Sequence, residues 1–142
     1  RFLKSEVERS ERTLIGKKRN VTAGRVIAEL NFGFWNSLYE THHYELLKGV
    51  PCTIFKTLPA GVGRKEVNQM VKQIRDLRNR ISHNEPLCFN NKAFDMTYAS
   101  DMYVMIRDFL SWIDPQIVTS LCKERLDYVE AEIKRTEKII NS

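Results

Sequence analysis

Long hydrophobic runs are absent from the sequence. Its 142 residues contain no run of about eighteen apolar residues, because charges interrupt even the most apolar stretches. A membrane-spanning helix is therefore not expected. The 42% hydrophobic content is enough for one ordinary core, so the sequence predicts a single domain over residues 1–142.

Cysteine is scarce as well. Cys52, Cys88 and Cys122 are odd in number, lie far apart and form no C-x-x-C pair. This spacing argues against a disulfide framework and against a thiolate zinc site. A reducing compartment, the cytoplasm, fits this cysteine usage best.

Motifs for metal, cofactor and nucleophile chemistry are missing too. His42 and His43 stand close to Glu45, but adjacent histidines point in different directions on a helix, and no second ligand pair follows. No serine, cysteine or carboxylate pair forms a recognisable nucleophilic or glycosidic arrangement. We expect neither a metal nor a cofactor.

Alternation typical of strands is also absent, and helical periodicity takes its place. In the first half we expect an exposed, charged helix in residues 1–19, then a central apolar helix over Thr22–Leu38. Its aromatic run could stack on bases, but such a run in an apolar helix is more typical of a core or a dimer interface, and we expect a core for Phe32, Phe34, Trp35 and Tyr39. Residues 41–63 are rich in glycine and proline and predict an irregular connection with about one short helix.

The second half contains the most regular amphipathic pattern. It predicts a helix over Arg64–His83, which Pro86 prevents from continuing. Further helices are expected over residues 102–113 and from Gln116 onward. The predicted fold class is all-α, a bundle of about four or five helices.

The charge balance is moderately basic. The chain has 23 Lys and Arg against 18 Asp and Glu, a net charge of +5. Such an excess favours a polyanionic partner. The loop formed by Lys17, Lys18 and Arg19 is compatible equally with contacts to RNA phosphates and with a solvated surface.

One end of the Arg64–His83 helix combines arginine and histidine. On a wheel of about 100° per residue, five polar residues lie on one flank of the apolar arc: Arg75, Arg78, Asn79, Ser82 and His83. Arg78 falls at the edge of that arc, so we expect packing to hold it in part. Residues one turn apart on this flank are placed to hydrogen bond with one another.

This combination suits RNA cleavage by the 2′-hydroxyl. Histidine transfers protons near neutral pH, and arginine stabilises charge on phosphate oxygens. A single histidine is one group short of an acid and a base, and a twofold dimer would supply a second His83 and a second Arg78 to the same cleft. The alternative is that the arginines form a solvated helix face and that His83 is a polar residue at a helix C-terminus.

The same residues resemble a known family. Arg78-Asn79 followed by His83 is similar to the signature of the HEPN superfamily, an arginine and a histidine separated by four to six residues, with a polar residue after the arginine. Residues 25–35 and 74–86 both resemble the Abi-like (abortive-infection) family of bacterial proteins within that superfamily, and with the spacing between them they cover about half of the chain.

The resemblance implies a HEPN-like bundle and a metal-independent endoribonuclease that acts as a toxin or phage-defence effector. It implies a homodimer with both motifs in one composite site, RNA such as tRNA as the substrate, and a possible antitoxin. Arg78 and His83 would be catalytic, with Asn79 in support. Arg75 and Ser82 are further supporting candidates on the same flank, and Arg80 joins the basic loop as a candidate for weak RNA binding.

Two features differ from the family pattern. Many relatives carry Ala-His-His where this chain has Ser82-His83-Asn84, so the second histidine is missing. Family members are commonly longer and this sequence begins with Arg1, so we expect the C-terminal portion of a longer Abi-like protein. The alternative function is a non-catalytic helical module that binds RNA or a protein.

Overall fold

The computed structural model describes residues 1–90 and 92–140 and is all-α, which confirms the predicted class: 72% of it is helix and 3% is strand. In chain order the elements are α1 (Phe2–Gly16), α2 (Ala23–Glu29), α3 (Phe32–Ser37), α4 (Thr41–Leu46), the 3-10 helix η1 (Val50–Ile54), α5 (Arg64–Ser82), β1 (Phe89–Asn90), β2 (Ala93–Phe94), α6 (Thr97–Ile113), the π-helix η2 (Ile117–Leu121) and α7 (Lys123–Ile140).

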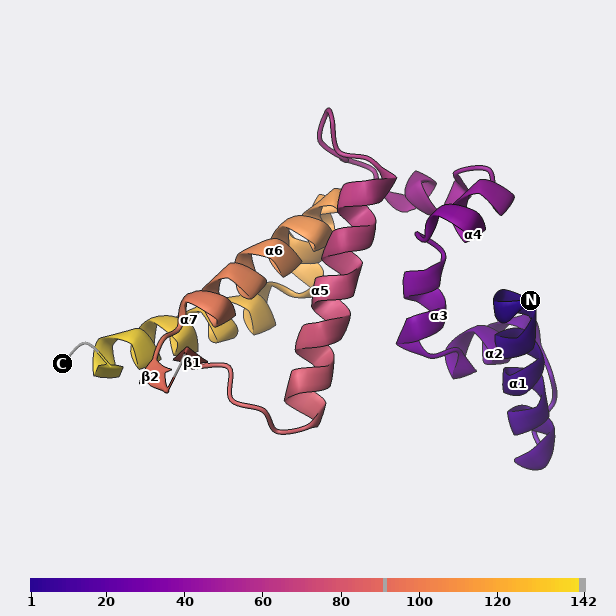
Figure 1. Cartoon of the computed structure of the whole chain (residues 1–142), viewed down its shortest axis with the longest axis horizontal. Coiled ribbons are helices and arrows are strands. Elements are labelled where there is room, and N and C mark those ends of the chain that lie inside the picture. Colours follow the sequence, from indigo (N-terminus) through magenta and orange to yellow (C-terminus); the bar gives the residue numbers. More distant parts are fainter. Residues whose placement is uncertain (91, 141–142) are drawn as a thin grey trace.

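The helices form two groups joined by α3 and α4. Figure 1 shows α5, α6 and α7 on one side of the molecule and α1 with α2 on the other. α3 contacts α5, α5 contacts α6, and α6 contacts α7. α5 and α6 lie close together where α5 begins and diverge towards the end of α5 (Figure 1). Residues 81–86, at and directly after the end of α5, are all exposed.

The first half of α5 is held in the core. Its N-terminus is capped by Glu66, whose carboxylate accepts a hydrogen bond from the Gly63 N–H at 2.9 Å and has a lowered pKa as a result. Val67 and Val71 are buried, with Val67 0% exposed. They form a cluster with two buried aromatic residues, Tyr39 and Phe55.

Backbone contacts tie this core to the end of α6. Thr57 donates from its hydroxyl to the Ser111 carbonyl at 2.8 Å and from its N–H to the Trp112 carbonyl at 3.0 Å. Lys56 forms an ion pair with Asp114, the residue after α6. The segment before α5 is therefore fastened to the far end of the next helix.

The prediction of one long helix over Thr22–Leu38 is wrong. The helix breaks at Leu30 and Asn31, which adopt extended backbone conformations, and Asn31 starts α3 by accepting a hydrogen bond from the Phe34 N–H at 2.9 Å. A Cβ at Gly33 would lie 3.0 Å from that Asn31 side-chain oxygen, so the glycine leaves room for the cap.

Other boundaries agree better with the sequence. α1 and α5 lie where helices are predicted, and α6 ends at Ile113 as expected. The irregular 41–63 segment contains α4 and η1, one helical segment more than predicted, and the expected loop after α5 contains the hairpin of β1 and β2.

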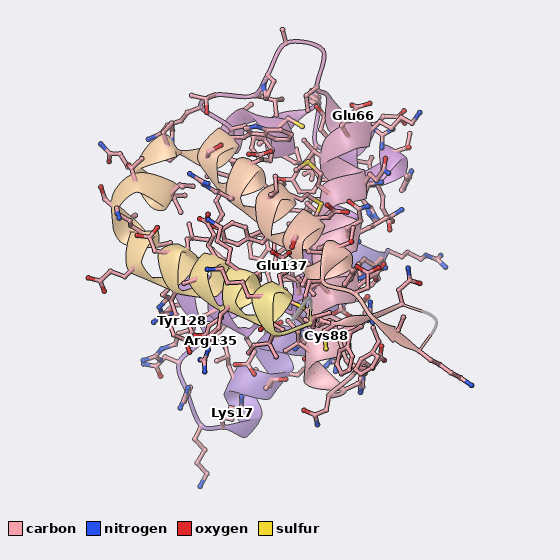
Figure 2. All side chains as sticks on the ribbon, turned by 90° about the vertical axis from the view of Figure 1, so that its left-hand side faces the viewer. Lys17, Glu66, Cys88, Tyr128, Arg135 and Glu137 are labelled. Carbon is pink, nitrogen blue, oxygen red and sulfur yellow. The ribbon has the colours of Figure 1, made fainter. Side chains whose placement is uncertain are left out.

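α7 closes the C-terminal group. Figure 2 shows α7 running alongside α6, with Glu137 between the two helices, and the Glu137 carboxylate accepts a hydrogen bond from the Ser100 hydroxyl at 3.0 Å. About one turn further along α6, the Tyr103 hydroxyl donates a hydrogen bond to the Glu130 carboxylate of α7 at 3.0 Å. Among the helices of residues 1–90 and 92–140, none is both long and apolar enough to cross a membrane.

Candidate active site at the end of α5

The end of α5 is built by its capping residues. His83 is the C-cap, and Asn84 follows with a φ of 54°, in the left-handed region. The Asn84 N–H donates to the Ile81 carbonyl at 3.1 Å and the Glu85 N–H donates to the Arg80 carbonyl at 2.9 Å. These two bonds form a Schellman motif, which fixes the chain direction directly after His83.

The left-handed residue of this cap coincides with the last position of the Ala-His-His triplet that the resemblance led us to expect. The last residue of that triplet falls at position 84, where the backbone is left-handed. Asparagine and histidine are both enriched at positive φ, so either suits the cap. The missing histidine is therefore compatible with the same helix end.

Arg80 holds the chain that leaves the helix. Its Nη2 donates to the Pro86 carbonyl at 2.7 Å, its Nε lies 3.4 Å from a Glu85 carboxylate oxygen, and its guanidinium lies 4.5 Å from the ring centroid of Tyr98 on α6. The guanidinium is thus engaged within the chain, which favours a positioning role; its weak binding to RNA stays a prediction. No pattern in the sequence pairs Arg80 with Tyr98, because their contact depends on how α5 and α6 diverge.

The catalytic candidates lie on the solvent side of α5. Arg78 is exposed, and its Nη1 donates to the Asn79 side-chain oxygen at 3.3 Å. Ser82 donates from its hydroxyl to the Arg78 carbonyl at 2.8 Å. His83 is exposed, and within the described residues its imidazole forms no hydrogen bond.

Two details differ from the expected cluster. Arg78 is not held by packing as we expected, because its side chain is exposed. Arg75 pairs with its neighbour Asp76 at 3.4 Å and not with Asn79. The expected polar flank is present, but its members are not locked together.

Helix geometry separates the two catalytic candidates within one chain. Residues five positions apart on an α-helix differ by about 140° around the axis and about 7.5 Å along it. Arg78 and His83 therefore border the same face from opposite edges. A substrate phosphate that needs both groups at once is better served by side chains from two copies of this helix end.

An apolar groove begins at Leu77 and Ile81 of α5. It has a volume of about 410 Å³ between the last turns of α5, the first half of α6 and the middle of α7 and is lined by Leu77, Ile81, Leu87, Met96, Ala99, Met102, Tyr103, Ile106, Leu126, Tyr128, Val129, Glu132, Ile133 and Thr136. Three of its residues are exposed, Ile81 at 55%, Tyr128 at 67% and Val129 at 44%. Figure 2 shows Tyr128 on the outer side of α7.

The basic loop lies elsewhere. Lys17 forms an ion pair with Glu29 at 2.6 Å, which joins α1 to α2. Lys18 and Arg19 are exposed next to it. Figure 1 places this turn on the far side of α3 from α5, so the structure does not bring Lys17, Lys18 and Arg19 to the candidate site.

The aromatic residues around α3 are only partly in the core. Phe34 and Tyr39 are buried, but Phe32 and Trp35 are 38% and 39% exposed. Phe32 and Trp35 line a second apolar cavity of about 430 Å³ between α3, η1, α5 and α6. The prediction that this segment is central to the core is therefore correct for two of the four residues.

The histidine pair on α4 has structural contacts. His43 hydrogen bonds through Nδ1 with the Ser37 carbonyl at 3.0 Å. Within residues 1–90 and 92–140 no three His, Cys, Asp or Glu side chains are grouped as metal ligands. Metal independence of any reaction remains a prediction.

Comparison with known proteins adds no relative. No protein-family model and no curated protein matches the sequence, and no solved structure matches the fold. The resemblance to the Abi-like family therefore rests on the residues quoted above.

Proposed function

We propose that the protein is a metal-independent endoribonuclease of the HEPN type, acting in the bacterial cytoplasm as an abortive-infection toxin or phage-defence effector. The observation that carries the proposal is the exposed pair of Arg78 and His83 at a rigidly capped helix end. tRNA or another cellular RNA is the substrate, and a neutralising antitoxin is a possible partner.

The reaction follows from the side chains. One imidazole accepts the proton of the ribose 2′-hydroxyl as the 2′-oxygen attacks the adjacent phosphorus. The bond from phosphorus to the 5′-oxygen breaks, and a second imidazole protonates that oxygen as it leaves. The products are a 2′,3′-cyclic phosphate and a 5′-hydroxyl end. Arg78 stabilises the charge on the phosphate oxygens, and Asn79 orients Arg78.

The need for two imidazoles supports a twofold dimer. His83 is the histidine at this helix end, and the apolar groove with Ile81 and Tyr128 offers the surface on which a second copy packs. An isologous contact there places both α5 ends near the twofold axis. In such a dimer each chain contributes Arg78 and His83 to one cleft.

The second candidate function is a helical module that binds RNA or a protein without cleaving it. Its support is that the members of the polar flank are not locked together, whereas catalytic groups are usually held by their neighbours. A fold alone does not distinguish the two functions.

Cleavage in EDTA separates them. Purified protein is incubated with tRNA and with total cellular RNA, alongside His83→Ala and Arg78→Ala variants. We expect cleavage by the parent protein, with 5′-hydroxyl ends that a polynucleotide kinase labels directly, and a loss of roughly a hundredfold or more in each variant. Equal degradation by all three proteins would mean that a contaminant cleaves the RNA.

A further inference from the structure

The hairpin between α5 and α6 exposes two aromatic side chains. Phe89 of β1 faces Phe94 of β2 across the antiparallel strands, with ring centroids 4.5 Å apart. Their exposed fractions are 42% and 61%, whereas Phe55 in the core is 8% exposed. Large aromatic residues on a hairpin surface are the groups on which unpaired nucleobases stack.

A pocket lies beside this pair. Its volume is about 380 Å³, and it is lined by Arg80, Phe89, Asn90, Asp95, Thr97, Tyr98 and Asp101. This volume is within the range of sites that hold small ligands. At about 100° per residue, Arg80 lies about 60° around the axis of α5 from His83 and about 160° from Arg78, so the pocket lies on the His83 side of the helix.

The charges in the pocket disfavour a phosphate. The Asp95 carboxylate accepts hydrogen bonds from the Thr97 N–H at 2.8 Å and from the Asn90 amide at 3.2 Å. Bonds from Thr97 and then Asn90 lower the pKa of Asp95, so it is ionised at neutral pH. Asp101 is exposed, and among the described residues its carboxylate has no hydrogen bond or ion pair.

We propose that this pocket binds one unpaired nucleobase of the RNA, with Phe89 stacked on its face and Asp101 accepting a hydrogen bond from its exocyclic amino group. Cytosine, adenine and guanine carry such a group and uracil does not, so the site prefers cytidine to uridine. The inference rests on the proposed RNA substrate and assigns to it a single-stranded region, because paired bases do not offer their faces for stacking.

The hairpin itself offers a different reason for the aromatic pair. Cross-strand apolar contacts stabilise short hairpins, and leucine at position 89 would keep such a contact with Phe94. Leucine has no aromatic face, so Phe89→Leu separates stacking on RNA from support of the hairpin. Phe89→Tyr keeps both the aromatic face and the cross-strand contact.

Binding is measured by fluorescence anisotropy with labelled single strands of about 12 nucleotides, all cytidine or all uridine. The parent for this experiment is the His83→Ala protein, so that cleavage does not interfere. We expect the cytidine strand to bind at least about fivefold more tightly than the uridine strand. Phe89→Leu weakens binding roughly five- to a hundredfold, and Phe89→Tyr binds like the parent.

Two further variants complete the test. Phe2→Leu, at an exposed phenylalanine on α1 away from the site, is the matched control and leaves binding unchanged. Asp101→Asn removes the preference for cytidine and leaves binding of the uridine strand as it was. Circular dichroism of each variant checks that the helices are intact.

The outcomes separate this inference from the proposed function. RNA binding that Phe89→Leu leaves unchanged overturns the pocket and leaves the ribonuclease proposal standing. Equal loss in Phe89→Leu and Phe89→Tyr, or no preference between the two strands, also overturns the pocket. Absence of RNA binding by the parent overturns both proposals.

Discussion

The two halves of α5 differ in what surrounds them. The first half, around Val67 and Val71, is buried against α3, η1 and the end of α6. The second half has Arg78 and His83 in solvent and Ile81 at 55% exposure beside an open apolar groove. One continuous helix thus joins a buried first half to an exposed end, and that end is where we propose that a partner chain and a substrate bind.

The largest contrast comes from placing the same charge on each half. Val67→Asp buries a carboxylate without a partner and lowers the free energy of unfolding by more than about 4 kcal/mol. Ile81→Asp places it at a half-exposed position and leaves the helical content of the chain intact. Urea unfolding and circular dichroism of the two variants make the comparison.

Ile81→Asp also tests the dimer. A charge in the groove prevents a second copy from packing there, so light scattering at micromolar concentration gives a monomer where the parent gives a dimer. Leu121→Asp is the matched control, because Leu121 is 79% exposed and lies outside the groove. A dimer that survives Ile81→Asp would show that the copies pack on another surface.

Removing the Arg80 contacts loosens the uncovered end. Arg80→Ala deletes the hydrogen bond to the Pro86 carbonyl and the contact with the Tyr98 ring, at a cost of about 1–2 kcal/mol. We expect the rate of RNA cleavage to fall by more than this loss of stability alone explains, because His83 lies inside the segment that Arg80 fixes. Arg80→Lys keeps the positive charge but lacks the planar guanidinium that contacts Tyr98, so we expect it to recover little of the lost cleavage or stability. Cleavage rates and thermal unfolding of both variants give the two quantities.

The cap itself contributes less. Asn84→Ala forces alanine into a left-handed backbone and lowers stability by about 1 kcal/mol, whereas Asn84→Gly and Asn84→His are tolerated. Thermal unfolding of the three variants tests the order. Equal stability of Asn84→Ala and the parent would contradict the Schellman geometry.

The smallest effect concerns the anchored half and depends on pH. Hydrogen bonds from Lys56 and then from the Gln116 N–H lower the pKa of Asp114. Its stabilising contribution is therefore complete above the ordinary pKa of aspartate and is lost as the pH falls through the lowered pKa. Asp114→Asn lowers Tm at neutral pH and flattens this part of the pH profile. A Tm difference between parent and variant that grows on acidification would contradict the sign.

The sequence predicted the anchored features better than the uncovered ones. The bounds of α5 follow from regular apolar spacing and from Pro86, which are local signals. The break at Asn31 was missed because one polar residue inside an apolar run is read as a helical position, although Asn31 caps a new helix. The helical wheel placed Arg78 beside the apolar arc, but its exposure depends on the divergence of α5 and α6, which no local pattern encodes.

Mixed dimers test the composite site most directly. The parent and His83→Ala proteins are unfolded together in equal amounts, refolded and assayed for RNA cleavage in EDTA. If both imidazoles are required, a dimer with one altered chain is inactive, and the mixture cleaves at about a quarter of the rate of the same total amount of parent protein. A rate of about one half would show that each chain cleaves by itself, and would contradict the site completed by a second copy of α5.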